Sequence, residues 1–474
     1  MPRLPLIASL TAALMASACI STPDLGAKPQ LESVPAQAAF AAPVADWPAT
    51  DWWRAYGDAQ LDALIAEGLR DSPTIAAADA RLRRAQALVT QAGAAELPSI
   101  SANGSFAESR PSLNNGTPVP PAVQGWNDTG RLSLDFNWEL DFWGKNRAAV
   151  ASATSEADAS RADAAGARLM ISTSIAAAYA DLARLYADRD VLASSLKVRE
   201  ETLTLVSRRV ATGYDSNAEL RQAEAGPPAA RADLKATDEL IALTKLRLAA
   251  LMGAAPDRAA AIARPAAPAL KSFGLPVQIP AQLVGRRPDL VAARWRAEAA
   301  SERIDVAHAA FYPNVNLVGL IGLQSLGIGN LADSGSGIGS AGVALNLPIF
   351  DAGRRKAGYR VARADYDAAV ASYDGALNNA LEEVADAVTS QRALEGRLSD
   401  TREAYAAAHE GWRLSRRRYD AGAADYQSVL IAEDRMLGVQ RAVAALESRR
   451  FVLDLALVRA LGGGYREAPP PAAD

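Results

Sequence analysis

The sequence has very little of the chemistry on which most enzymes and metal sites depend. Its 474 residues include one cysteine, Cys19, and two histidines, His308 and His409. Transition-metal and thiol sites are built from such side chains, so we expect no metal site and no bound cofactor. The formal net charge of −4 gives no general basic character of the kind that nucleic-acid binding needs. The composition therefore argues against metal, thiol and nucleic-acid functions, and we nominate no catalytic residue.

Long apolar runs are also absent from most of the chain. After residue 21 there is no stretch of 18 or more apolar residues, the length that a membrane-spanning helix requires. If the chain crosses a membrane, it must do so with strands.

The first residues read MPRLPLIASLTAALMASACIS, with one arginine, an apolar stretch and small residues before Cys19. This order is typical of a secretory signal, and ASAC resembles a bacterial lipoprotein cleavage box. We expect residues 1–18 to be a lipoprotein signal peptide and Cys19 to carry a covalent lipid such as palmitate; an ordinary signal is the alternative. The residues after Cys19 are not the aspartate that commonly retains lipoproteins in the inner membrane, which favours the outer membrane. Residues 19–50, rich in Ala and Pro, are expected to form a lipid-anchored tether and not a packed element.

Landmark residues recur at fixed offsets, which indicates an internal duplication. The pairs Pro73/Pro288 and Pro98/Pro313 are 215 residues apart, and the pairs Gly144/Gly353, Gly213/Gly422 and Gly253/Gly462 are 209 residues apart. The offset changes once, so the first copy has six more residues between its second landmark and its third. We expect a first structural repeat over residues 51–253 and a second over residues 271–465.

The interval in which the offset changes has the pattern of a β-hairpin in each copy. Residues 132–142 alternate between apolar side chains on one parity and polar side chains on the other, and turn-rich segments lie between the alternating stretches. We expect one hairpin over about residues 98–142 and another over about residues 313–350. Asp135, Asn137 and Glu139 share the polar parity and are expected to face a wet lumen.

Very long helices are expected after each hairpin. Between Gly144 and Gly213, and again between Gly353 and Gly422, lie segments with few helix breakers and with apolar residues at helical spacing. One helix over each segment would be about 100 Å long. Gly213 and Gly422 are expected to reverse the chain into return arms. In the first arm, Gly226-Pro227-Pro228 predicts a kink or a short break.

Four strands cannot close a barrel, and an open strand edge has no partner for its backbone groups in lipid. A membrane-spanning sheet therefore requires several copies of the chain. Two copies would give eight strands and an interior filled by side chains, whereas three would give twelve strands and leave a lumen.

Six stretches carry a resemblance to a known family: DWWRAYGDAQLDALI, WELDFWGKNR, RRPDLVAAR, AAFYPNVNL, LPIFDAGRR and LGGGY. They resemble those of the outer membrane factors, the TolC-like export channels, and in particular their lipoprotein, OprM-like branch for multidrug efflux. The resemblance implies an α+β membrane channel, a homotrimer whose twelve-stranded β-barrel in the outer membrane is continuous with a long periplasmic α-helical barrel. It implies a passive exit channel of a tripartite efflux system, with a periplasmic adaptor and an inner-membrane transporter as partners.

The resemblance also implies roles for residues near the two chain reversals. Gly213, Gly422, Arg209 and Arg418 match the periplasmic tip, where an adaptor would dock. Glu219 and Tyr419 match positions that can be joined in a closed entrance gate. Two positions depart from the family pattern, because Ser428 stands where an acid is common and Ala424 where some members have a basic residue.

Two other functions remain open at this point. One is an outer-membrane duct for type I protein secretion, a function of the same class. The other, of a different class, is a lipid-anchored periplasmic coiled-coil scaffold or adaptor, which would explain the helices and Cys19 but not the duplicated alternating segments. The exported compound and the partner pump cannot be read from this chain.

Overall fold

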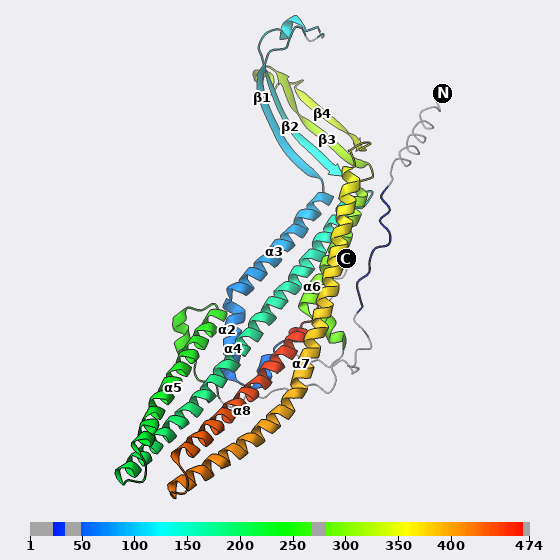
Figure 1. The fold of residues 1–474 in the computed structure, drawn as a ribbon. Helices are drawn as coiled ribbons and strands as arrows, with labels where there is room; N and C mark the ends of the chain where they lie inside the picture. The colour runs from blue at the N-terminus through cyan, green and yellow to red at the C-terminus, as the bar shows by residue number, and fades with distance from the viewer. Residues whose placement is uncertain (1–21, 34–48, 115, 117, 267–280, 468–474) are drawn as a thin grey trace. The chain divides into compact units, whose positions relative to one another are not determined.

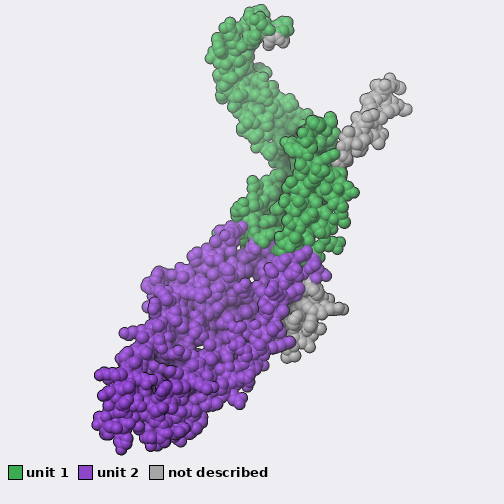
Figure 2. Space-filling model, in the orientation of Figure 1, with its two compact units in different colours: residues 1–31, 82–160, 293–373 green, residues 32–81, 161–292, 374–474 purple. Residues whose placement is uncertain are grey.

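The computed structural model describes residues 22–33, 49–114, 116, 118–266 and 281–467 (Figure 1). The predicted signal peptide and Cys19 lie outside these residues. The chain divides into two compact units, shown in different colours in Figure 2. Unit 1 comprises residues 1–31, 82–160 and 293–373, and unit 2 comprises residues 32–81, 161–292 and 374–474.

Unit 1 contains one antiparallel sheet with the strand order β1-β2-β3-β4 (Figure 1). The strands are β1 (Ser99–Ser109), β2 (Asn127–Glu139), β3 (Asn314–Leu326) and β4 (Gly337–Asn346). All four lie inside the two ranges that the alternating pattern predicts for hairpins. Short 3₁₀ turns, Pro121–Val123 and Ile328–Asn330, lie in the connections between paired strands.

The helices repeat in pairs of matching length. Short helices α3 (Pro73–Gly93) and α6 (Pro288–Ala309) precede the hairpins, long helices α4 (Lys145–Ala211) and α7 (Arg354–Asp420) follow them, and α5 (Asn217–Leu251) and α8 (Tyr426–Ala460) return. Helices α4 and α7 have 67 residues each, which is about 100 Å as predicted, and α5 and α8 have 35 each. Among the described residues, no helix combines the length and the apolar character that a bilayer-spanning helix needs.

Helix α5 runs through Pro227 and Pro228 as one helix, so the predicted short break does not occur. Each proline removes the hydrogen bond to the carbonyl four residues earlier, and its ring crowds that carbonyl. Ala223, Pro227 and Ala230 are all buried on the same side of this part of the helix. Tertiary packing therefore holds the segment helical despite its unfavourable composition.

The main core of unit 2 is built around helix α2 (Ala59–Asp71) and the preceding 3₁₀ turn Trp52–Tyr56. Asp58 caps α2 by accepting the N–H groups of Gln60 and Leu61, at 2.9 and 3.0 Å. Its other carboxylate oxygen accepts the hydroxyl of the buried Tyr179 on α4 at 2.8 Å. One carboxylate thus joins the start of α2 to the middle of the long helix.

Two of the sequence motifs, RRPD and LGGG, meet in unit 2. The Arg287 guanidinium donates to Asp289 and to Glu383 of α7, both at 2.7 Å, and to the carbonyl of Ala460 at 3.3 Å. A Cβ atom on Gly462 would lie 3.0 Å from the Arg287 Cα. The glycine therefore permits the close backbone approach that lets the arginine reach the end of α8.

Part of the predicted tether, residues 22–33, is described, and residues 22–31 pack within unit 1. The Tyr366 hydroxyl of α7 donates to the carbonyl of Pro29 at 2.8 Å, and the Lys28 ammonium donates to Ser301 of α6 at 3.2 Å. The Pro29 carbonyl has no partner in a regular helix or strand, and the Tyr366 hydroxyl supplies its donor. The expectation of an unpacked tether is therefore wrong for this segment.

We predict that Gly253→Ala lowers the thermal unfolding midpoint of the detergent-solubilised protein more than Gly213→Ala does. Both glycines have a left-handed φ, +76° and +77°, which costs an alanine about 1–2 kcal/mol. Only at Gly253 would the new Cβ also collide, at 2.6 Å from the Asp71 carbonyl oxygen, whereas nothing lies within 4 Å at Gly213. Equal losses for the two variants would contradict this account.

Candidate functional site

One face of the sheet is apolar and exposed in the single chain. The register places Leu132 beside Leu323 and Leu134 beside Ile321, so alternate residues of neighbouring strands share this face. Its large apolar side chains are between 37% and 70% exposed. They are Ile100, Phe106, Leu132, Leu134, Ile321, Leu323, Val343 and Leu345. An apolar surface spread over all four strands requires an apolar environment.

On β1 and β2 the opposite face of the sheet is polar and hydrogen-bonded, whereas on β3 and β4 the same face also carries Val318, Leu320 and Ile338. The Asp135 carboxylate accepts the amide of Asn103 at 2.7 Å and the hydroxyl of Ser133 at 2.9 Å. Asn137 is exposed on the same face, and Glu139 forms an ion pair with Lys145 at 2.7 Å. The predicted lumen residues therefore share one face, although Glu139 already has a partner at the start of α4.

Two tryptophans fix the corner where the sheet meets the helices of unit 1. The indole N–H of Trp138 donates to the Glu96 carbonyl at 2.9 Å, and that of Trp143 donates to the Pro313 carbonyl at 2.8 Å. The Trp143 ring also stacks on Tyr312, with centroids 4.6 Å apart. These contacts cap the backbone just before β1 and β3, so both tryptophans have a structural role at the corner.

The far ends of the long helices in unit 2 are two similar turns. Gly213 and Gly422 have φ values of +77° and +73°, and each follows the last turn of a long helix. Ser216 then caps α5 and Asp425 caps α8, each accepting a backbone N–H three residues later. The turns therefore reverse the chain as the sequence predicts.

A three-residue cluster joins the two turns. The Arg209 guanidinium donates to both oxygens of Asp215, at 2.9 and 3.1 Å, and to the backbone carbonyl of Tyr419 at 3.0 Å. The Tyr419 hydroxyl donates to Asp215 at 2.5 Å. The Arg209 guanidinium also lies 4.4 Å from the centroid of the Tyr419 ring, a cation–π contact. We call Arg209, Asp215 and Tyr419 the tip cluster.

The tip cluster sets the charge of its members. Burial opposes ionisation of Asp215, but hydrogen bonds from Arg209 and Tyr419 outweigh it and lower the pKa of the carboxyl. Burial, together with the neighbouring carboxylate, raises the pKa of the Tyr419 hydroxyl. The cluster therefore contains a carboxylate, a guanidinium and a neutral phenol at physiological pH.

Glu219 and Tyr419 are not hydrogen-bonded to each other in the single chain. The Glu219 carboxylate accepts the N–H of Ser216 at 2.6 Å and completes a capping box at the start of α5. Tyr419 has Asp215 as its partner instead. The sequence Ser216-x-x-Glu219 is a recognisable capping-box signal, whereas no local pattern identifies Asp215 as the partner of a residue more than 200 positions away.

The other residues predicted for the tip differ in how far they are exposed to solvent. Arg209 is committed to the tip cluster, with only 18% of its side chain exposed. Arg418 is exposed beside Gly422. Ser428, the counterpart of Glu219, donates its N–H to Asp425 at 2.9 Å and so belongs to the cap of α8. Of the two predicted docking arginines, the structure thus leaves only Arg418 open to solvent.

Further ion pairs join the helical hairpin α4–α5 to the helical hairpin α7–α8, within the helices that lead to the two turns. Arg199 of α4 donates to Asp434 of α8 at 2.9 Å and approaches the buried Glu433 at 3.4 Å. Arg416 of α7 lies 3.3 Å from Glu201 of α4. The tip cluster is therefore the end of a series of polar contacts between the hairpins.

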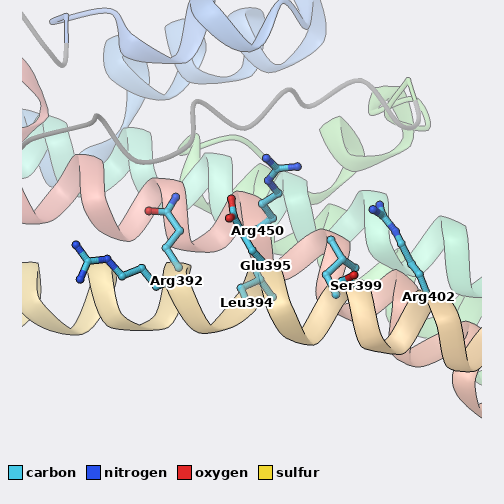
Figure 3. Close-up of a pocket in the computed structure, with 8 residues that line it drawn as sticks. Arg392, Leu394, Glu395, Ser399, Arg402 and Arg450 are labelled. Atoms are coloured by element: carbon cyan, nitrogen blue, oxygen red, sulfur yellow. The ribbon is translucent and has the colours of Figure 1, made fainter.

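A groove between α7 and α8 is shown in Figure 3. Leu394 and Leu398 give it an apolar floor, and Arg392, Arg402 and Arg450 give it a charged rim. Arg402 pairs with Glu447 across the two helices at 2.7 Å. The same groove is also lined by Glu395 and Ser399 of α7.

We predict that Asp215→Asn speeds amide hydrogen exchange at Tyr214 and Gly422 by roughly tenfold, because a hydrogen-bonded charge pair is removed. Glu219→Ala should speed exchange only at the start of α5, where the capping box acts. Because the pKa of the Asp215 carboxyl is lowered in the folded protein, its hydrogen bonds stabilise the tip fully at any pH above the ordinary carboxyl pKa of about 3.9. This stabilisation is lost as the pH falls through the lowered pKa. The native tip should therefore keep its slow amide exchange from pH 7 to pH 5. If both variants speed exchange equally at Tyr214 and Gly422, Asp215 does not hold the two turns together.

The protein-family model described as outer membrane efflux protein matches residues 64–254 and 279–463. Curated relatives agree with it. The fusaric acid resistance protein FusA of Burkholderia cepacia is 37% identical over 366 residues, which cover 74% of this chain and 68% of FusA. The multidrug resistance outer membrane protein MdtP of Escherichia coli is 29% identical over 434 residues, which cover 89% of this chain and 88% of MdtP.

Solved structures show the same architecture. The outer membrane protein VceC of Vibrio cholerae matches with a TM-score of 0.84 and 45% identity, covering 89% of this chain and 100% of VceC. The outer-membrane channel OprN matches with a TM-score of 0.84 and 26% identity, covering 92% of this chain and 99% of OprN. The fold class predicted from the sequence, an α+β membrane channel with four strands per chain and an internal duplication, is confirmed. The chain belongs to the outer membrane efflux protein family and is an outer-membrane efflux channel.

Proposed function

We propose that three copies of the chain close one twelve-stranded barrel in the outer membrane and conduct substrates passively through it. The observation that carries this proposal is the two-faced sheet. Its apolar face, exposed in the single chain, would contact lipid, and its polar face, with Asp135 and Asn137, would line a wet lumen. The outer strands β1 and β4 each have only one neighbour in the sheet, so only further copies can satisfy their backbone groups in lipid.

The number of copies follows from the polar face. Two copies would give eight strands, and the interior of an eight-stranded barrel is filled by side chains. The hydrogen-bonded group of Asn103, Ser133 and Asp135 is suited to water and not to a dry core. Twelve strands from three copies leave room for that water.

We also propose that the channel works with a periplasmic adaptor and an inner-membrane transporter, and that Cys19 carries a lipid anchor. A passive channel supplies no energy for export, so a partner such as an inner-membrane transporter has to supply it. The exposed Arg418 and the turns at Gly213 and Gly422 are the proposed docking points for the adaptor. Relatives are named for fusaric acid resistance, multidrug resistance and pyoverdine export, which supports efflux over protein secretion.

The tip cluster is the proposed closing element of the entrance. Arg209, Asp215 and Tyr419 hold the α4–α5 turn against α7, so opening the tip requires these bonds to break. Glu219 contributes to this gate by fixing the start of α5 and not by bonding Tyr419. The gate thus depends on a charge-assisted pair, which is stronger than a neutral hydrogen bond.

We predict that Leu134→Arg reduces outer-membrane insertion sharply, because an arginine on the lipid face costs about 2–4 kcal/mol near the bilayer midplane. The matched control is Asn137→Arg, which places the same side chain on the opposite face of β2. Asn137→Arg should insert normally and lower the cation selectivity of the channel in planar bilayers.

Membrane fractionation and single-channel recording measure both effects. Normal insertion of Leu134→Arg, or failed insertion of Asn137→Arg, would show that the two faces of the sheet are assigned the wrong way round.

We predict that Asp215→Asn raises the resting conductance of the purified channel more than Glu219→Ala does. The first change removes the charge that holds Arg209 and Tyr419 together, whereas the second weakens only a helix cap. Planar-bilayer recordings at one salt concentration compare the two variants with the native channel. Unchanged conductance in Asp215→Asn would remove the tip cluster from the gate.

A further inference from the structure

The face of the sheet that would line the lumen is divided into a polar part and an apolar part. Its side chains on β1 and β2 are mostly polar, whereas on β3 and β4 it carries Val318, Leu320 and Ile338. We call these three residues the inner apolar patch, and all three are half-buried in the single chain. The interior of a water-filled barrel is usually polar, so aliphatic side chains at this place need a physical reason.

The strand register sets one carboxylate directly beside the inner apolar patch. Asp135 of β2 lies opposite Leu320 of β3, and Leu320 lies opposite Ser340 of β4. Side chains directly opposite each other on neighbouring strands have Cβ atoms about 4.5–5.5 Å apart. A charged group, an aliphatic group and a small hydroxyl group therefore form one row across three strands.

Small residues leave the patch uncovered on the side of β4. Ser340 lies opposite Leu320, and Gly342 lies opposite Val318. A Cβ atom added at Gly342 would meet nothing within 4 Å. No bulky side chain therefore covers Leu320 and Val318 from this strand, so an apolar group of a ligand can lie against them.

Asp135 keeps one oxygen open to a ligand. The Asn103 amide and the Ser133 hydroxyl both donate to Oδ2, at 2.7 and 2.9 Å. Among the described residues, none donates to Oδ1 and no cation forms an ion pair with this carboxylate. Arg131, the only cation of β2, donates to Gln324 at 3.3 Å instead. The carboxylate is thus held in position with a free acceptor for a cationic donor.

We propose that Asp135 and the inner apolar patch form a subsite for amphipathic organic cations on the wall of the channel. The ammonium group lies on Oδ1 of Asp135, and the apolar body lies across Leu320 toward Ser340. Neighbouring strands are about 4.8 Å apart, so this row spans about 10 Å, close to the length of about six extended methylene groups. The proposal rests on the proposed lumen, because the polar face must be open to water.

The subsite is suited to brief contact and not to retention. It lies on the face of a sheet and offers one charge beside a small apolar surface. Conduction requires binding that is favourable enough for entry and weak enough for release. The carboxylate attracts cations and repels anions, so the contact favours an amphipathic cation over an anion with the same apolar body.

Thiol modification of the full-length protein in lipid nanodiscs tests the subsite. The reporter is Ser340→Cys, at the end of the row, and the control reporter is Ser105→Cys, which lies on the same face opposite Arg131. Each is treated with two alkyl thiosulfonate reagents that share one ammonium group and differ in the apolar body, six carbons in one and two in the other. The native chain, whose only cysteine is Cys19, measures the background.

We expect Ser340→Cys to react about tenfold faster with the six-carbon reagent than with the two-carbon reagent, because the longer body contacts the patch. A six-carbon reagent with a sulfonate in place of the ammonium should show no such gain. Adding Leu320→Thr, which keeps a strand-forming residue, or Asp135→Asn should reduce the preference to about twofold or less. At Ser105→Cys the two ammonium reagents should react at similar rates.

The outcomes separate the subsite from the proposed function. Equal rates for the two ammonium reagents at Ser340→Cys, or a preference that survives either substitution, overturns the subsite and leaves the lumen standing. If neither cysteine reacts until the protein is unfolded, the polar face does not line a lumen, and the proposed function falls with the subsite. Val318→Thr replaces Leu320→Thr, with the same expected loss, if Leu320→Thr does not run as an oligomer on native gels.

Discussion

An unpaired strand edge cannot lie in hydrocarbon, because its N–H and C=O groups find no partner there and each costs several kcal/mol. The rest of the structure depends on this constraint. The chain supplies a sheet with one apolar face and two unprotected edges, β1 and β4. One chain therefore forms part of a barrel wall and no complete pore. The conducting path belongs to the assembly, and each strand edge is a recognition surface for another copy.

The duplication extends this logic to the helices. Helices α4 and α7 have 67 residues each and their return arms have 35 each, so the two hairpins of a chain reach the same length. They nevertheless differ where they meet: Asp215 of the first turn accepts hydrogen bonds from both Arg209 and Tyr419, while its counterpart in the second turn, Ala424, has no side-chain acceptor. A near-symmetric scaffold thus carries an asymmetric tip, and the asymmetry lies where an entrance gate would act.

The sequence predicts elements well where the signal is local and periodic. Proline and glycine spacing defines both repeats, and alternation along 132–142 predicts β2 and its two faces. Predictions fail where distant residues decide the outcome. Pro227 and Pro228 stay helical because packing overrides propensity. Residues 22–33 form hydrogen bonds with side chains of α6 and α7, and Tyr419 of α7 bonds to Asp215 of the first turn. The capping role of Glu219 is predictable from Ser216-x-x-Glu219, whereas the pairing with Tyr419 that the family resemblance implies stays a prediction.

Electron microscopy of the channel in lipid nanodiscs tests the central claim, that several copies share one barrel, most directly. The account predicts a hollow particle with three-fold symmetry end-on, twelve strands in the lipid-embedded wall and helical hairpins of about 100 Å on one side. A monomeric particle, or a two-fold particle with a filled eight-stranded wall, would contradict it.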